Sequence, residues 1–344
     1  MGGAGSASRT APVLVLSLGG TIGMAQGETG ALSIALDAAD LLTALEDEIT
    51  VPVEVEQVQA QPSSQLRLND VIVLAGRIAA HATAGRYVGV VVTQGTDTME
   101  ESAFALDLLV DSPIPVVVTG AMRSPGRPGS DASANLIAAV ATAASPSARG
   151  LGTLVVMNDE IHAARFVKKR HTTIPSAFVS VPGPIGWISE GRPRIALRPN
   201  ARMCVPMPDV DWNGRVPLVA VGLGDDGVLF EEMLHRPADG LVVAALGAGH
   251  VPQQLVAPLA TFATKIPVVL ASRTGAGEVP RSVYGFPGSE RDLLARGLVS
   301  GMWLDPWKCR VLLELLLRGP DPSGAAKAFT AVVEGALGNT ALTV

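Results

Sequence analysis

Two loops that carry threonine, each following an apolar strand, are the segments of this sequence best suited to chemistry. The first is VLVLSLGGTIGM (13–24), which ends in a glycine turn holding Thr21, and the second is VVVTQGTDTMEES (90–102), where Gly95 precedes Thr96 and Asp97. Glycines let a chain turn sharply, and open α/β sheets bind ligands at the carboxyl ends of their strands. If the two strand ends are neighbours, Thr21, Thr96 and Asp97 face one cavity.

The glycine turn does not fit a phosphate-binding loop. Its glycines are Gly19, Gly20 and Gly23, which is not the G-x-G-x-x-G spacing of a dinucleotide site, and no Gly-Lys-Ser/Thr follows. The remaining alternative to a nucleophile is structural, because Thr and Asp at a strand-to-helix junction are also good helix N-caps.

A third segment, MNDEIHAARFVKKRHTT (157–173), supplies candidate bases. A Thr hydroxyl is a poor nucleophile unless a neighbouring group takes its proton, and burial lowers the pKa of an ammonium group enough to make a lysine a base. On the residues alone, Lys168 and Lys169 both qualify. The structural alternative for the basic cluster VKKRH (167–171) is a solvated loop or helix end.

The elements that must position these loops follow from the hydropathy pattern. Apolar, β-branched runs alternate with segments of helical period, and a second such series follows an irregular stretch rich in Pro and Gly (176–215). Continuous apolar strands indicate a doubly wound, mostly parallel sheet covered on both faces. The predicted organisation is a disordered lead-in (1–11), a larger N-terminal α/β domain (12–200), a linker (201–215) and a smaller C-terminal α/β domain (216–344), in which DPWKCRVLLELLLR predicts an amphipathic helix.

Composition excludes several classes of function. A formal net charge of -6 argues against a general nucleic-acid binder, and no apolar run is long enough to cross a membrane. Cys204 and Cys309 match no ligand spacing, so we expect buried thiols in a reducing compartment, no metal, no cofactor and a cytoplasmic location.

Taken together, these motifs resemble the bacterial-type L-asparaginase family of Thr-dependent amidohydrolases. The matching segments are LGGTIG (18–23), QGTDTMEESA (94–103), PVVVTGAMRS (115–124), MNDEI (157–161) with KKRHTT (168–173), and DPWKCRVLLELLL (305–317). The resemblance implies hydrolysis of the side-chain amide of L-asparagine to L-aspartate and ammonia. It also implies a homotetramer of intimate dimers, with each site completed by a neighbouring subunit.

The resemblance also implies roles for particular residues. Thr21 is the nucleophile that forms an acyl-enzyme, and Lys169 polarises Thr96 in the second half of the site. Asp97 also holds the substrate ammonium, and Ser63 holds its carboxylate. Lys169 is preferred to Lys168 because the family's lysine stands two residues before the position of His171. The remaining pocket residues implied are Ser64, Gly20 and Gly95.

The sequence departs from the family pattern in three places. The loop after Thr21 (24–36) has no Tyr, although the family commonly places one there to assist the nucleophile. Gln94 replaces a usual His before GTDT, where we expect a tuning effect. His250 occupies a position that the family often fills with a polar residue reaching the partner subunit's site, so we expect it to affect side-chain selectivity. Glu278 is a second candidate for such a contact.

These departures keep other functions open. The substrate is alternatively another small amide, such as Gln, D-Asn or succinamate, or the chain is a non-catalytic homologue that binds a small molecule. The ammonia-producing half of a tRNA amidotransferase is disfavoured, because the sequence shows neither an extra N-terminal domain nor a basic face. Asp131 is predicted to be a helix N-cap, and His162 and His171 are isolated histidines without a metal-site spacing.

Overall fold

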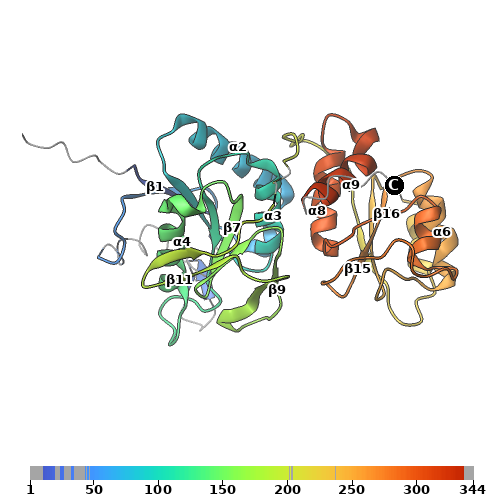
Figure 1. Ribbon diagram of the computed structural model, residues 1–344, viewed down its shortest axis with the longest axis horizontal. Coiled ribbons are helices and arrows are strands. Elements are labelled where there is room, and N and C mark those ends of the chain that lie inside the picture. The colour runs from blue at the N-terminus through green and yellow to red at the C-terminus, as the bar shows by residue number, and fades with distance from the viewer. Residues whose placement is uncertain are drawn as a thin grey trace, which may run out of the picture. The chain divides into compact units, whose positions relative to one another are not determined.

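The computed structural model describes residues 11–19, 24–26, 32–34, 43, 45, 47–200, 202, 204–236 and 238–336. The chain divides into two compact units, Met1–Pro199 and Asn200–Val344. Each unit contains a sheet with helices packed on it (Figure 1).

The first unit is built on one large sheet. In the described part of the unit it has eight strands in the order β12-β11-β8-β7-β6-β5-β1-β4. Their bounds are β1 Val13–Ser17, β4 Val53–Gln57, β5 Gly89–Thr93, β6 Val116–Thr119, β7 Thr153–Met157, β8 Glu160–Ala163, β11 Gly186–Ser189 and β12 Arg192–Ile195. Strands β4, β1, β5, β6 and β7 pair in parallel, and the other three join antiparallel. The predicted α/β class with a mostly parallel sheet is confirmed.

Helices cover both faces of this sheet. They are α2 Leu68–Ala84, α3 Met99–Leu109 and α4 Ala132–Ala144; α4 packs on β5, β6 and β7, while α3 packs on β6 and β7 from the opposite side and contacts α2 (Figure 1). Val13 and Val15 are buried in the same core cluster as Leu136 of α4. Leu14 and Leu16 are also buried, because successive strand residues point to opposite faces and both faces are covered.

Two short ribbons accompany the large sheet. One pairs β2 (Met24–Gln26) with β3 (Leu32–Ile34), and the other pairs β9 (Val167–Lys169) with β10 (Phe178–Ser180). The prediction of a loop or helix end for the basic cluster 167–171 is therefore wrong over residues 167–169. The physical reason lies outside the cluster itself, because β9 forms backbone hydrogen bonds with β10, which follows it in the chain.

Asp131 stands at the N-cap position of α4, but its side chain does not cap the helix. The carboxylate instead accepts hydrogen bonds from the backbone N–H groups of Met122 and Arg123 at 3.0 and 2.8 Å, and from Asn135 Nδ2 at 3.0 Å. The predicted capping role is thus wrong, because the preceding loop folds back onto the carboxylate and its N–H groups donate hydrogen bonds to it. Asp131 ties this loop to the start of α4.

The second unit has a smaller parallel sheet. Among its described residues the strands β13 Leu218–Ala220, β14 Leu241–Ala245, β15 Val268–Ser272 and β16 Val299–Ser300 lie in that order. The helices are α5 Val228–Met233, α6 Val256–Ala263, α7 Glu290–Ala295, α8 Pro306–Leu317 and α9 Ala325–Gly335. Val243, Leu259 and Leu293 belong to one buried cluster that joins the sheet to α6 and α7.

The helix predicted over DPWKCRVLLELLLR is confirmed as α8, but it is buried on most of its sides, so its predicted amphipathic character is wrong. It packs against β13, β14 and β15 as well as α9, which leaves little of its surface to water. Even the side chain of Lys308 is only 1% exposed, and its Nζ lies 2.9 Å from Asp305 Oδ2. Cys309 is buried as expected, but Cys204 is exposed, because the irregular segment that carries it lies outside the helices and strands of the core.

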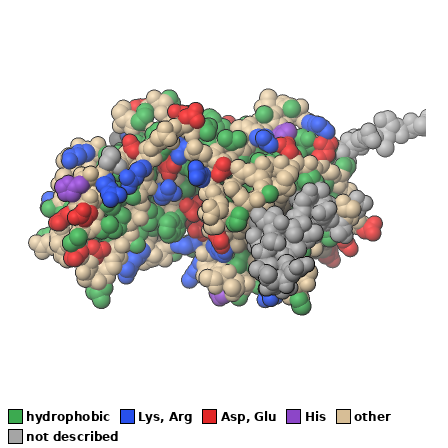
Figure 2. All heavy atoms as spheres, turned by 180° about the vertical axis from the view of Figure 1, so that it is seen from behind, with side chains coloured by type: hydrophobic (Ala, Val, Ile, Leu, Met, Phe, Trp, Pro, Cys, Tyr) green, Lys and Arg blue, Asp and Glu red, His purple; other side chains and the backbone are tan. Residues whose placement is uncertain are grey.

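The helices and the charged side chains of the described residues bear on the surface of the protein. Within the described ranges no helix is both long and apolar enough to span a membrane. On the face displayed in Figure 2, Lys and Arg side chains are interspersed with Asp and Glu side chains.

Candidate active site

The carboxyl ends of three parallel strands meet at one edge of the first unit's sheet. Ser17, Thr93 and Thr119 are in register at the ends of β1, β5 and β6. The loops that follow are tied together, since Leu18 N donates to Thr93 O at 2.9 Å and Gln94 N donates to Thr119 O at 3.0 Å. The two loops that the sequence singled out therefore begin side by side.

The loop after β1 turns at Gly19, whose φ is 89°. A Cβ at this position would lie 2.9 Å from Gln61 N, so both the backbone conformation and the close approach require glycine. Gly20 and Thr21 lie outside the described residues, as does most of the loop without tyrosine. The nucleophilic role of Thr21 stays a prediction.

The loop after β5 brings Thr96 and Asp97 together with a lysine from a distant segment. Lys169 Nζ lies 2.8 Å from Thr96 Oγ1 and 2.7 Å from Asp97 Oδ1. The Lys169 side chain is 15% exposed and the Asp97 side chain 68% exposed, while Thr96 is buried. The buried Thr96 hydroxyl therefore contacts the Lys169 ammonium group, which in turn contacts the solvent-exposed carboxylate of Asp97.

Strand geometry decides which of the two lysines reaches this loop. Lys168 and Lys169 are consecutive residues of β9, so their side chains point to opposite faces of the ribbon. The backbone N–H of Lys169 also donates to a carboxylate oxygen of Glu100, in the first turn of α3. Glu100 is not predicted as a site residue from the sequence, because an acidic residue in a first helical turn is ordinary.

Ser63 lies against the same loop. It is 3% exposed, its Oγ accepts a hydrogen bond from Asp97 N at 3.2 Å, and its carbonyl oxygen accepts one from Thr98 Oγ1 at 3.0 Å. A Cβ at Gly95 would lie 2.6 Å from Ser63 Oγ, so only glycine permits this approach. Thr98 occupies the N-cap position of α3 without capping it, because its hydroxyl is committed to Ser63. Ser64 is exposed.

Gln94 is fully buried behind this loop. Its Nε2 lies 3.3 Å from Gly95 O and 3.3 Å from Ser102 Oγ, so it joins the loop to α3. The structure thereby places Gln94 next to the loop backbone on the side away from solvent. A tuning effect of this residue on the site stays a prediction.

The two histidines of the third segment differ in environment. His162 on β8 has no solvent exposure; its Nδ1 lies 2.9 Å from Ser180 Oγ and its Nε2 lies 3.4 Å from Glu160 Oε2. Burial lowers the pKa of His162 to about 4, so the ring is neutral at pH 7. His171 is exposed and accepts a hydrogen bond from Thr173 N at 3.1 Å. Within the described chain, no cluster of three or more His, Cys, Asp or Glu side chains could bind a metal ion.

The second unit holds His250 and Glu278. His250 packs edge-on against Tyr284, with ring centroids 4.7 Å apart, and its Nε2 lies 3.3 Å from Glu290 Oε2. Burial disfavours charge on Glu290, but backbone N–H groups, including that of Tyr284, donate to it and hold its pKa below the ordinary value. His250 is therefore oriented by its own unit. Glu278 is exposed, and the contacts of both residues with a neighbouring subunit stay predictions.

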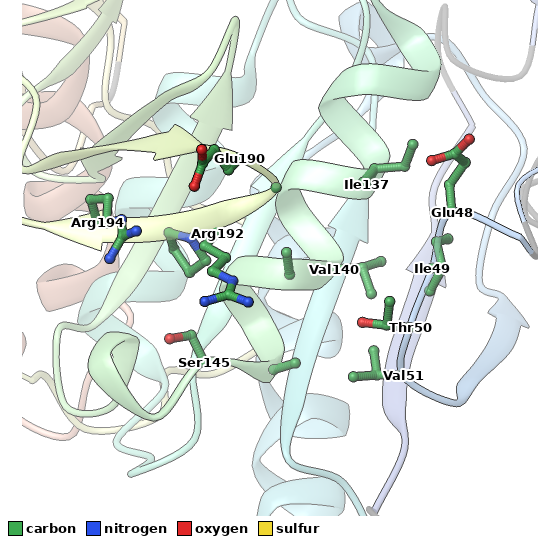
Figure 3. A pocket seen from close by; sticks show the side chains of 14 residues that line it. Glu48, Ile49, Thr50, Val51, Ile137, Val140, Ser145, Glu190, Arg192 and Arg194 are labelled. Atoms are coloured by element: carbon green, nitrogen blue, oxygen red, sulfur yellow. The ribbon is translucent and has the colours of Figure 1, made fainter.

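A pocket of about 690 Å³ lies elsewhere in the first unit. Figure 3 shows it between α4, the turn joining β11 to β12, and residues 48–51. Its lining includes Val140, Glu190 and Arg192. Among the described residues, those that line this pocket are separate from those that meet at Thr96.

Comparisons with known proteins match both parts of the chain to described protein families. Residues 12–201 match the family described as "Asparaginase, N-terminal", and residues 215–329 match "Glutaminase/Asparaginase C-terminal domain". An L-asparaginase of Bacillus licheniformis is 32% identical over 315 residues, which is 89% of this chain and 95% of the relative. L-asparaginase 2 of Escherichia coli is 32% identical over 340 residues, covering 96% and 95%. A probable L-asparaginase of Deinococcus radiodurans is 40% identical over 254 residues, covering 72% and 76%.

Proposed function

Because the chain belongs to the asparaginase family, we propose that it hydrolyses the side-chain amide of L-asparagine to L-aspartate and ammonia. The observation that carries the proposal is the approach of Lys169 Nζ to Thr96 Oγ1 and Asp97 Oδ1 at 2.8 and 2.7 Å. Amide hydrolysis needs a nucleophile, a group that passes a proton to the leaving ammonia, and partners for a zwitterionic substrate. The loop with Thr96 and Asp97 offers candidates for the proton carrier and for a partner of the substrate.

The proton carrier in this proposal is the Thr96 hydroxyl. Since Lys169 Nζ donates to Thr96 Oγ1, the hydroxyl's own proton is directed elsewhere and can be given to the departing nitrogen. Thr21 attacks the amide carbon, and the C–N bond breaks as Thr96 gives its proton to the nitrogen. The proton that Thr21 loses restores the Thr96 hydroxyl, so that ammonia leaves and an acyl-enzyme ester remains. Water then hydrolyses this ester and restores the Thr21 hydroxyl.

Two further side chains fit the charged ends of an amino-acid substrate. The Asp97 carboxylate extends into solvent and offers a partner for the substrate ammonium. Ser63 Oγ accepts a hydrogen bond from Asp97 N, which leaves its own O–H proton to donate to the substrate carboxylate. Desolvating these pairs on binding strengthens them relative to their strength in water.

The primary test is ammonia release from L-asparagine by the purified protein and by the variants Thr21→Ala and Thr96→Ala. Both variants should lose at least about 100-fold in kcat, because each removes a group that acts in the transition state. Thr83→Ala, on the exposed surface of α2, is the matched control and should retain full activity. Full turnover by both site variants would refute the assignment.

Substrate choice needs its own measurement. Turnover of L-Asn, L-Gln, D-Asn and succinamate should be compared at equal concentration, with L-Asn expected to give the highest kcat/KM. Higher turnover of another amide would reassign the substrate while keeping the chemistry. Binding of L-aspartate without ammonia release from any amide would instead support a non-catalytic binding protein.

A homotetramer and a cytoplasmic location belong to the same proposal, and His250 and Glu278 are its candidates for completing a neighbour's site. Light scattering after size exclusion tests the assembly, and fractionation of cells tests the location. If His250→Ala is inactive on its own, mixing it with inactive Thr96→Ala subunits tests the shared site. Recovery of activity in the mixture is expected if one native site assembles from two intact halves.

A further inference from the structure

Strand β9 is the part of the first unit that delivers Lys169, and it is paired on one side by β10 in a two-stranded ribbon. Alternate N–H groups of an antiparallel strand point toward its partner and away from it. Arg170 N donates to Ala177 O, on the β10 side, at 2.7 Å. The N–H of Lys169 therefore points away from β10, where an edge strand has no backbone partner.

Glu100 occupies that position. Its carboxylate accepts the Lys169 N–H, and the residue is only 7% exposed. A partly buried backbone N–H without an acceptor is unfavourable, so the contact constrains where β9 can lie. The negative charge is itself favoured in the first turn of α3, where the helix N-terminus carries partial positive charge.

The same short segment of chain thus holds Lys169 at two points. Thr96 and Asp97 meet the end of its side chain, while Glu100, four residues after Thr96, holds its backbone. We propose that Glu100 is a positioning residue that sets the approach of Lys169 Nζ to Thr96 Oγ1. This inference rests on the function proposed above and assigns to Glu100 no contact with substrate.

The expected kinetic effect follows from geometry. A displacement of about 1 Å at a reacting group can reduce a rate by about 100-fold. Loss of the Glu100 contact should therefore lower kcat by more than it raises KM. Ser63 and the main chain of its loop keep their places, although the contact of Lys169 with Asp97 shifts as well.

Two conservative variants separate position from charge. Glu100→Gln keeps the length and an acceptor oxygen but removes the charge, and Glu100→Asp keeps the charge but is one methylene shorter. The proposal expects Glu100→Gln to retain kcat within about threefold and Glu100→Asp to lose about 10- to 100-fold. The opposite order would show that the charge matters, and would overturn the proposal.

A second readout does not depend on turnover. Hydrogen exchange of the 166–171 segment, followed by mass spectrometry, should be faster in Glu100→Asp than in the wild type and unchanged in Glu100→Gln. Glu101→Gln, in the same helical turn, is the matched control and should leave kcat and exchange unchanged. Unchanged exchange in Glu100→Asp overturns the inference. Absence of ammonia release by the wild type would refute the proposed function, while the exchange experiment would still test the contact.

Discussion

The buried His162 makes the stability of this protein sensitive to mild acid. Its ring has no solvent exposure, and burial lowers its pKa to about 4, against 6.5 for an ordinary histidine. Between these two values the unfolded chain binds a proton at this position that the folded chain does not. Protonation of His162 therefore does not lower the free energy of unfolding at pH 7.5. Its destabilising effect grows as the pH falls from about 6.5 toward about 4.

The magnitude follows from the same two pKa values. One pKa unit corresponds to about 1.4 kcal/mol, so the loss reaches about 3 kcal/mol in full and about 2 kcal/mol at pH 5. This is a large fraction of the stability of a typical domain. Because β8 carries His162 and contacts β10, the partner of β9, the strand that holds Lys169 is part of the affected region.

The assay is urea unfolding at pH 7.5 and pH 5 for the wild type and for His162→Gln, which does not titrate. The wild type should lose about 2 kcal/mol more than this variant between the two pH values. His171→Gln is the matched control, since His171 is exposed, and its pH dependence should equal that of the wild type. Equal losses in the wild type and His162→Gln would refute the reasoning, as would titration of His162 near 6.5 in an NMR experiment. Glu160, 3.4 Å from the ring, is the charge that would cause such a result.

Further predictions concern the site and its supports. Lys169→Met should lower kcat at least about 100-fold in steady-state assays, whereas Lys168→Met, on the other face of β9, should retain it within about threefold. Gly95→Ala should raise KM for the amide about tenfold, since its Cβ would lie 2.6 Å from Ser63 Oγ, and an unchanged KM would mean that this serine does not bind substrate. Asp131→Ala should reduce the free energy of unfolding by about 3 kcal/mol in urea titrations, because two backbone N–H groups lose a charged acceptor.

The apolar runs and the glycine positions of the chain are enough to predict the sheet and the loops that leave its carboxyl edge. Strands β1 and β5 are continuous apolar runs because both faces of the sheet are covered, and that signal is local. The glycine turn at Gly19 is also readable from the chain, since a φ of 89° favours glycine wherever it occurs. The positions of Thr96 and Asp97 at the carboxyl end of β5 are also predictable, because they closely follow an apolar run.

Which groups meet those loops depends on how the whole chain folds. Lys169 reaches Thr96 across 73 residues, and its neighbour Lys168 faces the other way because of the register of β9. Helix α8 departs from its prediction because the sheet and α9 pack against it, which its own residues do not reveal. Asp131 departs from its prediction because the preceding loop folds back onto its carboxylate. Periodicity and capping rules describe what a segment prefers alone, whereas these contacts depend on which segments the fold brings together.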